Sequence, residues 1–138
     1  MIDDVVATWH EFLRGQRPNA LDELLHDECV FISPIVFTPQ RGKAITMKYL
    51  QAAGATLAGV KEPSKGGDGK DRSFRYVKEV IAHPYAVLEF ETYLGDTLVN
   101  GVDIITCDDD GKIIEFKVMV RPLQGVNAIH EFMGRALA

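Results

Sequence analysis

Residues 102–122 read VDIITCDDDGKIIEFKVMVRP, and this stretch decides the fold. Two β-rich runs with alternating apolar and polar residues flank the polar turn Asp108-Asp-Asp-Gly111. Alternation with a period of two is typical of a half-buried strand, and an Asp–Gly pair between two such runs indicates a hairpin. A four-residue turn pairs Ile105 with Ile114 and Asp103 with Phe116. Directly opposed residues share one face of an antiparallel hairpin.

Two earlier runs extend this hairpin into a meander. We expect four strands, at residues 73–82, 86–94, 97–107 and 112–121, with the first two turns at His83-Pro84 and Gly95-Asp96. A two-residue Gly95-Asp96 turn pairs Phe90 with Gly101 and Leu88 with Asp103. The face that we expect to be buried carries Leu88, Phe90, Thr92, Val99, Gly101, Asp103, Ile105, Ile114, Phe116, Val118 and Val120.

The rest of the chain reads as helices with one short strand. Apolar residues at helical spacing predict a helix capped by Asp3 or Asp4, a short helix capped by Asn19, and helices over residues 43–58 and 127–137. Residues 29–32 form a short β-rich segment that Ser33-Pro34 stops. Helices first and a meander after is an α+β pattern, with the helices packed on one face of a curved antiparallel sheet.

Length and composition favour a soluble single domain spanning residues 1–138. The apolar content is 46%, which is ordinary for a globular protein, and the net charge is −5 without a basic block. We therefore expect no binding to nucleic acid or to an anionic membrane surface. No apolar run approaches the roughly 18 residues of a membrane span. Cys29 and Cys107 suit a reducing compartment, and we expect a cytoplasmic protein.

Three features could suggest a phosphate, calcium or metal site, but their residues do not fit one. Residues 59–73 carry no periodic apolar signal and predict a mobile loop that gates a cavity, but Asp71 follows Gly69-Lys70 where a phosphate loop needs Ser or Thr. The acidic turn at residues 108–111 is not a calcium loop, because position 117 is Lys. The cysteines and histidines lack metal-ligand spacing, so we expect no metal and no cofactor.

Asp103 is the anomaly of the expected core face, where it is the one ionisable residue of its three strands. A carboxylate among apolar residues must be paired, reach water in a cavity, or take up a proton at a raised pKa. An acid buried in a cleft is a candidate functional residue. The alternative is a structural Asp that hydrogen-bonds to a helix or loop.

The order of elements, with Asp103 on the penultimate strand, resembles the nuclear transport factor 2-like superfamily over nearly the whole chain. The resemblance is carried by DECVFISP (27–34), by Arg41-Gly42, and by residues 102–114 and 115–122. The superfamily includes ketosteroid isomerases, SnoaL-like polyketide cyclases, limonene epoxide hydrolase and scytalone dehydratase. It implies a cone of helices over a curved sheet with a deep apolar pocket. Asp103 matches the protonated Asp that helps ketosteroid isomerases hold a developing oxyanion.

The chain also departs from these enzymes. Ser33, before Pro34, stands where the isomerases carry the acid that serves as general base, and a serine hydroxyl needs a base of its own. Trp9 falls near the isomerase oxyanion Tyr, and Gly101 replaces the Arg of the epoxide hydrolases. Four histidines are scattered, at positions 10, 26, 83 and 130, and His130 is a candidate for the mouth of a pocket. Glu79 could join Asp103 as an acid/base pair if the turn after it is tight.

The resemblance implies an isomerase, cyclase, dehydratase or hydrolase that needs no cofactor and acts on a small hydrophobic molecule. Asp103 is the expected acid or oxyanion donor. The expected substrate-binding residues are Trp9, Phe31, Ser33, Tyr49, Phe90, Phe116 and Val118, and Phe37 is a further aromatic candidate for the cavity wall. Two alternatives remain open: a non-catalytic module that binds a ligand in the same pocket, and a dimeric protein-interaction domain. We expect a homodimer through the outer sheet face, where Val102, Ile104 and Met119 interleave with Glu115 and Lys117.

Overall fold

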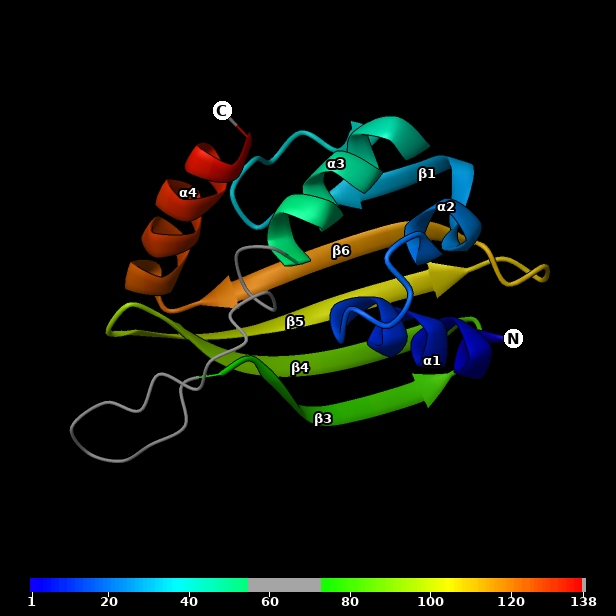
Figure 1. The fold of residues 1–138 in the computed structure, drawn as a ribbon, viewed down its shortest axis with the longest axis horizontal. Helices are drawn as coiled ribbons and strands as arrows, with labels where there is room; N and C mark the ends of the chain where they lie inside the picture. The colour runs from blue at the N-terminus through cyan, green and yellow to red at the C-terminus, as the bar shows by residue number, and fades with distance from the viewer. Residues whose placement is uncertain (55–72, 138) are drawn as a thin grey trace.

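A computed structural model describes residues 1–54 and 73–137 of the chain, and the loop predicted at residues 59–73 lies outside them except for Ser73 (Figure 1). The helices are α1 (Ile2–Leu13), α2 (Ala20–Leu24), α3 (Lys43–Ala53) and α4 (Leu123–Leu137). The strands are β1 (Leu25–Ile32), β2 (Gln40–Arg41), β3 (Arg75–Ala82), β4 (Tyr85–Leu94), β5 (Thr97–Cys107) and β6 (Ile113–Arg121). The predicted α+β class is confirmed.

Most differences from the predicted elements lie at helix and strand ends. Helix α1 begins at Ile2 after Met1, so Asp3 and Asp4 lie in its first turn, where their charges meet the positive end of the helix dipole. Strand β1 starts directly at the end of α2, four residues earlier than expected. Helix α4 begins at Leu123, also four residues early. The expected extension of α3 to residue 58 lies outside the described residues.

The six strands form one sheet in the order β2-β1-β6-β5-β4-β3. Strands β3 to β6 make an antiparallel meander, and β1 lies parallel to β6 with β2 at its far edge. The helices pack on the sheet in three places: α1 against β3, β4 and β5, α3 against β1, and α4 against β4, β5 and β6. Figure 1 shows α4 at the left end of the sheet, α3 over β1 near one edge of the sheet, and α1 with α2 toward the right. None of the described helices is long and apolar enough to cross a membrane.

The register predicted for the β4–β5 hairpin is confirmed, and the register predicted for the next hairpin is wrong by two residues. Asp103 lies opposite Leu88 on β4 as expected, but opposite Val118 on β6 rather than Phe116. Cys107 pairs with Ile113, so the turn is one residue longer than predicted, and a bulge adds a second residue, Ile114, before Thr106 pairs with Glu115. The bulge also buries Ile113 and exposes Ile114, which we had placed on the core face.

The buried side chains form two clusters rather than one continuous core. The larger cluster lies between the sheet and helices α1 to α3. The smaller one joins Phe90, Leu94 and Val99 to Ile129 of α4. Tyr76 and Val118 pack against both clusters, so they mark the junction between them.

Gly101 allows a close approach that shapes this junction. A Cβ atom at Gly101 would lie 2.4 Å from Cζ of Phe90 and 2.9 Å from the carbonyl oxygen of Met119. The ring of Phe90 therefore occupies the space beside β5 that a larger residue at position 101 would fill.

Candidate functional site

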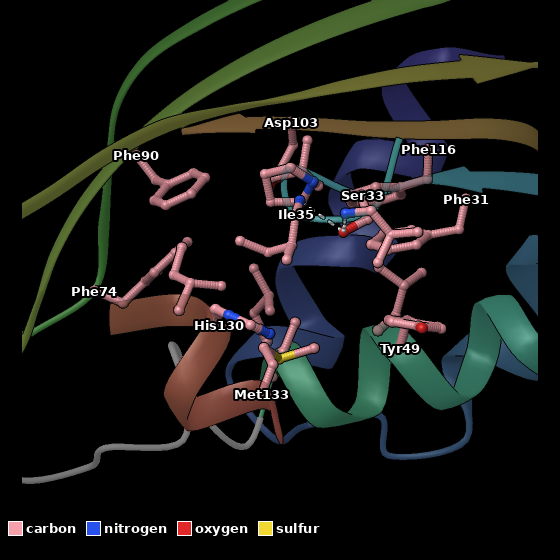
Figure 2. Close-up of a pocket in the computed structure, with 18 of the residues that line it drawn as sticks. Phe31, Ser33, Ile35, Tyr49, Phe74, Phe90, Asp103, Phe116, His130 and Met133 are labelled. Carbon is pink, nitrogen blue, oxygen red and sulfur yellow. Dashed lines mark hydrogen bonds between the residues drawn. The ribbon is translucent and has the colours of Figure 1, made fainter. Parts of the chain in front are cut away.

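A cavity of about 270 Å³ opens between the sheet and helices α1, α3 and α4, where the two core clusters meet (Figure 2). This volume lies near the lower end of the roughly 300–1,000 Å³ of typical ligand pockets. All eight residues selected from the sequence line it: Trp9, Phe31, Ser33, Tyr49, Phe90, Asp103, Phe116 and Val118. Phe37 does not line it and is 98% exposed, because its loop carries the ring into solvent.

The cavity wall also contains residues that sequence reasoning did not select. They include Phe74 directly before β3, Tyr76 of β3, Ile35 after β1, and Ile129 and Met133 of α4. Ile129 and Met133 were recognisable as the apolar side of a helix, but nothing in the sequence says what that side faces. His130, a candidate for the mouth, lines the cavity and is exposed.

Asp103 is the buried acid of this wall. Its neighbours across the sheet are Leu88 and Val118, and the residue is 5% exposed. Burial among apolar side chains raises the pKa of Asp103 to about 7, while a hydrogen bond from Tyr76 acts in the opposite direction. Near neutral pH a substantial fraction of this carboxyl is therefore protonated.

A chain of two hydrogen bonds holds the Asp103 carboxyl in place. The Tyr76 hydroxyl donates to Oδ2 of Asp103 over 2.6 Å, and Nε1 of Trp9 donates to the Tyr76 hydroxyl over 2.8 Å. Burial, and then the nearby charge of Asp103, raise the pKa of Tyr76 well above its usual value, so Tyr76 keeps its proton. The indole N–H of Trp9 is used within the protein, whereas the resemblance placed Trp9 near a group that contacts the ligand oxygen.

Tyr76 was missed because of an irregularity in β3. Tyr76 lies opposite Phe90, Glu79 lies opposite Leu88, and the β3–β4 register shifts between Tyr76 and Lys78. Residues three apart in a regular strand point to opposite faces, so no alternating pattern puts both Tyr76 and Glu79 on the core face. The register shift is a bulge that brings both side chains to the core face, and the sequence carries no signal for it.

The remaining candidates do not direct a reactive group at the cavity. Glu79 shares the core face, but it pairs with Nε2 of His10 over 2.5 Å and does not line the cavity with Asp103. Oγ of Ser33 accepts hydrogen bonds from the backbone N–H groups of Ile35 and Val36, which closes the turn after β1.

His26, His83, Cys29 and Cys107 lie outside the wall of the cavity, and Nδ1 of His83 lies 3.8 Å from Sγ of Cys107. His26 caps the Glu28 backbone N–H on an exposed part of β1, and Nδ1 of His83 accepts from the Ile2 backbone N–H. Within residues 1–54 and 73–137, no group of three or more His, Cys, Asp or Glu side chains is arranged to hold a metal ion.

The site can therefore hold an apolar molecule and offer it a polar contact from Asp103. Among the described residues, Tyr76 is the hydrogen-bond partner of the Asp103 carboxyl, and it uses Oδ2. Oδ1 is left to carry the proton, and a neutral carboxyl in a dry pocket can donate to an oxygen that gains negative charge. Aromatic rings surround this donor, with Trp9 4.9 Å from Phe116 and Phe31 5.2 Å from Tyr49 between ring centroids.

Comparison with known proteins places this geometry in a family. No protein-family model matches the chain, and a comparison with curated protein sequences found no match. A steroid delta-isomerase from Pseudomonas aeruginosa is 31% identical, with a TM-score of 0.83 over 98% of this chain and 90% of that one.

Two further solved structures share the fold at lower identity. A nuclear transport factor 2-like protein of unknown function from Mesorhizobium loti is 21% identical, with a TM-score of 0.66 over 87% of this chain and 90% of that one. A putative polyketide cyclase from Sinorhizobium meliloti is 13% identical, with a TM-score of 0.60 over 84% and 94% of the two chains. The sheet order, the cone of helices and the extended match to the isomerase together show that this chain belongs to the nuclear transport factor 2-like superfamily.

Proposed function

We propose that the cavity binds a small hydrophobic molecule with a carbonyl group, and that the protein is a cofactor-independent enzyme of the isomerase or cyclase kind. Asp103 donates a hydrogen bond from Oδ1 to the substrate oxygen as that oxygen becomes an enolate. The observation that carries this proposal is an acid, 5% exposed, in the wall of an apolar cavity, with a pKa of about 7.

The energetic argument concerns the change of charge on the substrate oxygen. A donor fixed in a water-excluded site stabilises a developing anion far more than a donor in water, because it needs no reorganisation as the charge forms. Tyr76 fixes Asp103, and Trp9 fixes Tyr76, so the donor is held before the substrate arrives. The similarity to a protein named as a steroid delta-isomerase supports an apolar substrate and an isomerisation.

Binding of a matched pair of probes tests the role of Asp103. Isothermal titration calorimetry is run with 2-naphthol, whose oxygen resembles that of an enolate, and with naphthalene, which lacks it. Asp103→Leu should weaken 2-naphthol binding about tenfold or more, because Asp103 donates to the naphtholate oxygen of the bound probe and a hydrogen bond to a charged group contributes roughly 1.5–3 kcal/mol. Naphthalene binding should not weaken. Equal effects on both probes, or no binding of either to the wild-type protein, would reject the proposal.

A non-catalytic ligand-binding module is the second candidate, and the same pocket favours it. A binding module would differ from an enzyme in one respect: it would bind 2-naphthol in a way that depends on Asp103, but it would convert none of the unsaturated ketones tested. A protein-interaction domain would show neither.

The outer face of the sheet supports a homodimer, which is the remaining part of the proposal. Val80, Val102 and Met119 line a shallow hollow there, with Lys78 and Arg121 at its margins. Apolar side chains flanked by charges suit a self-complementary contact between two copies.

The proposed location is the cytoplasm. Cys29 and Cys107 are both free thiols, which suits a reducing compartment. Fractionation of the source cells, followed by antibody detection, tests this; recovery in an extracellular or periplasmic fraction would contradict it.

A further inference from the structure

Proton transfer in this cavity requires a second group besides Asp103. If Asp103 holds the substrate oxygen as a donor, another side chain must take the proton from the neighbouring carbon. Among residues 1–54 and 73–137, the titratable side chains of the cavity wall are Tyr49, Tyr76, Asp103 and His130. Of these four side chains, His130 is the one suited to accept the proton, given the chemistry of the other three.

The two tyrosines are poor proton acceptors. A phenol ordinarily stays protonated at neutral pH. Tyr76 in addition accepts the Trp9 indole N–H and donates to Asp103, so its hydroxyl is fully used. Ser33 lines the cavity too, but its Oγ closes a turn and has no base beside it in the described structure. An imidazole, by contrast, exchanges a proton readily near neutral pH and is the commonest general base of enzymes.

His130 has the position that such a base needs. It lies on α4 directly after buried Ile129, so the buried face of the helix brings it to the cavity. Figure 2 shows His130 beside Met133 on the helix side of the cavity, with Asp103 on the strand side. A flat substrate between α4 and the sheet would meet the acid at one end and the imidazole at the other. Exposure of His130 at the mouth also lets it exchange its proton with solvent.

We propose that His130 is the general base of this site, a role that rests on the proposed function and makes the substrate an enolisable ketone with an adjacent double bond. The neutral imidazole takes a proton from the carbon between the carbonyl and the double bond. The C–H electron pair forms a new C=C bond, and the carbonyl π electrons move to the oxygen, which Asp103 holds. The imidazolium then returns the proton to the far end of the dienolate. This step yields the conjugated ketone and restores neutral His130, so no further reactant is needed.

The test uses 5-androstene-3,17-dione, an apolar β,γ-unsaturated ketone whose conjugated product absorbs in the ultraviolet. His130→Gln should lower kcat/KM about 100-fold or more, which is the usual contribution of a general base. Its affinity for 2-naphthol should change by less than about threefold. His26→Gln is the matched control, because His26 lies on an exposed part of β1 away from the cavity, and it should keep the wild-type rate.

A second variant separates a chemical role from a structural one. His130→Ala leaves an opening at an exposed position, so added imidazole should restore part of its rate in proportion to concentration. A loss of rate that imidazole does not restore, with a matching loss of 2-naphthol affinity, would reduce His130 to a wall residue and overturn the base assignment.

The outcomes also separate this inference from the proposed function. Wild-type turnover that survives in His130→Gln but is lost in Asp103→Asn makes Asp103 the base and overturns our assignment. Wild-type binding of 2-naphthol without conversion of the ketone overturns it as well, and favours the ligand-binding module. Absence of both binding and turnover rejects the proposed function itself, and His130 with it.

Discussion

The buried acid Asp103, which we propose as a functional group, makes the stability of the fold depend on pH. The buried carboxyl has its pKa raised from 3.8 to about 7, so between these values the folded chain binds a proton that the unfolded chain does not. Stability then falls as pH rises through that interval, because the slope of the unfolding free energy follows the difference in bound protons. The contribution is complete below about pH 4 and is lost by about pH 7.

Asp103→Asn should isolate this effect. Asn keeps the shape of the side chain and an acceptor for the Tyr76 hydroxyl, but it does not titrate. We expect the variant to gain stability relative to wild type by a few kcal/mol between pH 4 and pH 8, since each pKa unit corresponds to about 1.36 kcal/mol. Urea unfolding of both proteins across this range measures the difference. A difference that does not vary with pH would show that the Asp103 pKa is not raised.

The hydrogen bond from Tyr76 changes the stability that we expect of the Asp103→Leu variant. The sequence alone predicts that leucine leaves the fold intact or more stable, because it replaces a buried acid with a hydrocarbon. The structure adds a cost, since the Tyr76 hydroxyl loses its acceptor. A buried unpaired donor costs roughly 1–3 kcal/mol, so Asp103→Leu should melt below the double variant Tyr76→Phe/Asp103→Leu. Equal melting temperatures at pH 7 would mean that the hydroxyl finds another partner.

Tyr76→Phe should raise the pKa of Asp103 further. The hydroxyl donates to Oδ2 of Asp103 and favours the charged carboxylate, so its removal leaves burial unopposed. Titration of the aspartate side-chain carboxyl by ¹³C NMR measures the shift. Tyr85→Phe is the control, because Tyr85 is 55% exposed at the start of β4. An Asp103 pKa that stays the same or falls in Tyr76→Phe would refute the hydrogen-bond chain.

At the scale of elements, alternation settled the buried faces of β4 and β5, but not the faces of β3 or the register of β5 with β6. Asp103 was identified as a buried acid because β4 and β5 alternate without interruption and their turn has two residues. Tyr76 escaped because it depends on a bulge in β3, and the β5–β6 register escaped because it depends on a bulge and on a turn one residue longer than predicted. Packing of α4 against the meander also brought His130 to the cavity, a long-range contact that local periodicity does not encode.

Gly101 ties the β5 backbone to the cavity through Phe90, and Gly101→Ala should expose that dependence. The added methyl group would clash with the Phe90 ring and with a backbone oxygen that cannot move. We expect a loss of about 1–3 kcal/mol in the free energy of unfolding, as in other overpacked cores. Gly134→Ala is the matched control: nothing lies within 4 Å of its new methyl group, and alanine in a helix gains about 0.5–1 kcal/mol over glycine. Equal unfolding free energies for the two variants in urea would disprove the clash.

The whole molecule has one face covered by helices and one face where the described residues leave apolar side chains in the open. Val80 is 54% exposed and Met119 50% exposed beside the hollow of about 310 Å³ on the outer side of the sheet. Lys78, Glu89 and Arg121 stand around them, which supplies both signs of charge for a contact related by twofold symmetry. The helices cannot cover this face, because they all pack on the cavity side.

The exposed apolar side chains of this outer face predict that the protein is a dimer in solution. Met119→Lys should make it a monomer. Val102 lies directly opposite Met119 across β5 and β6, so the new ammonium groups of the two copies would enter the apolar centre of the contact, where unpaired charge is costly. Light scattering at tens of micromolar should give twice the chain mass for wild type and the chain mass for the variant. Phe37→Lys introduces the same charge at a side chain that is 98% exposed, outside the hollow, and should remain dimeric.

A monomeric wild type would reject the homodimer. A dimer that Phe37→Lys dissociates and Met119→Lys does not would move the contact to the cavity side. Since Asp103 and His130 both face that side, the outer-face dimer leaves the mouth of the cavity open, and Met119→Lys should bind 2-naphthol as the wild type does.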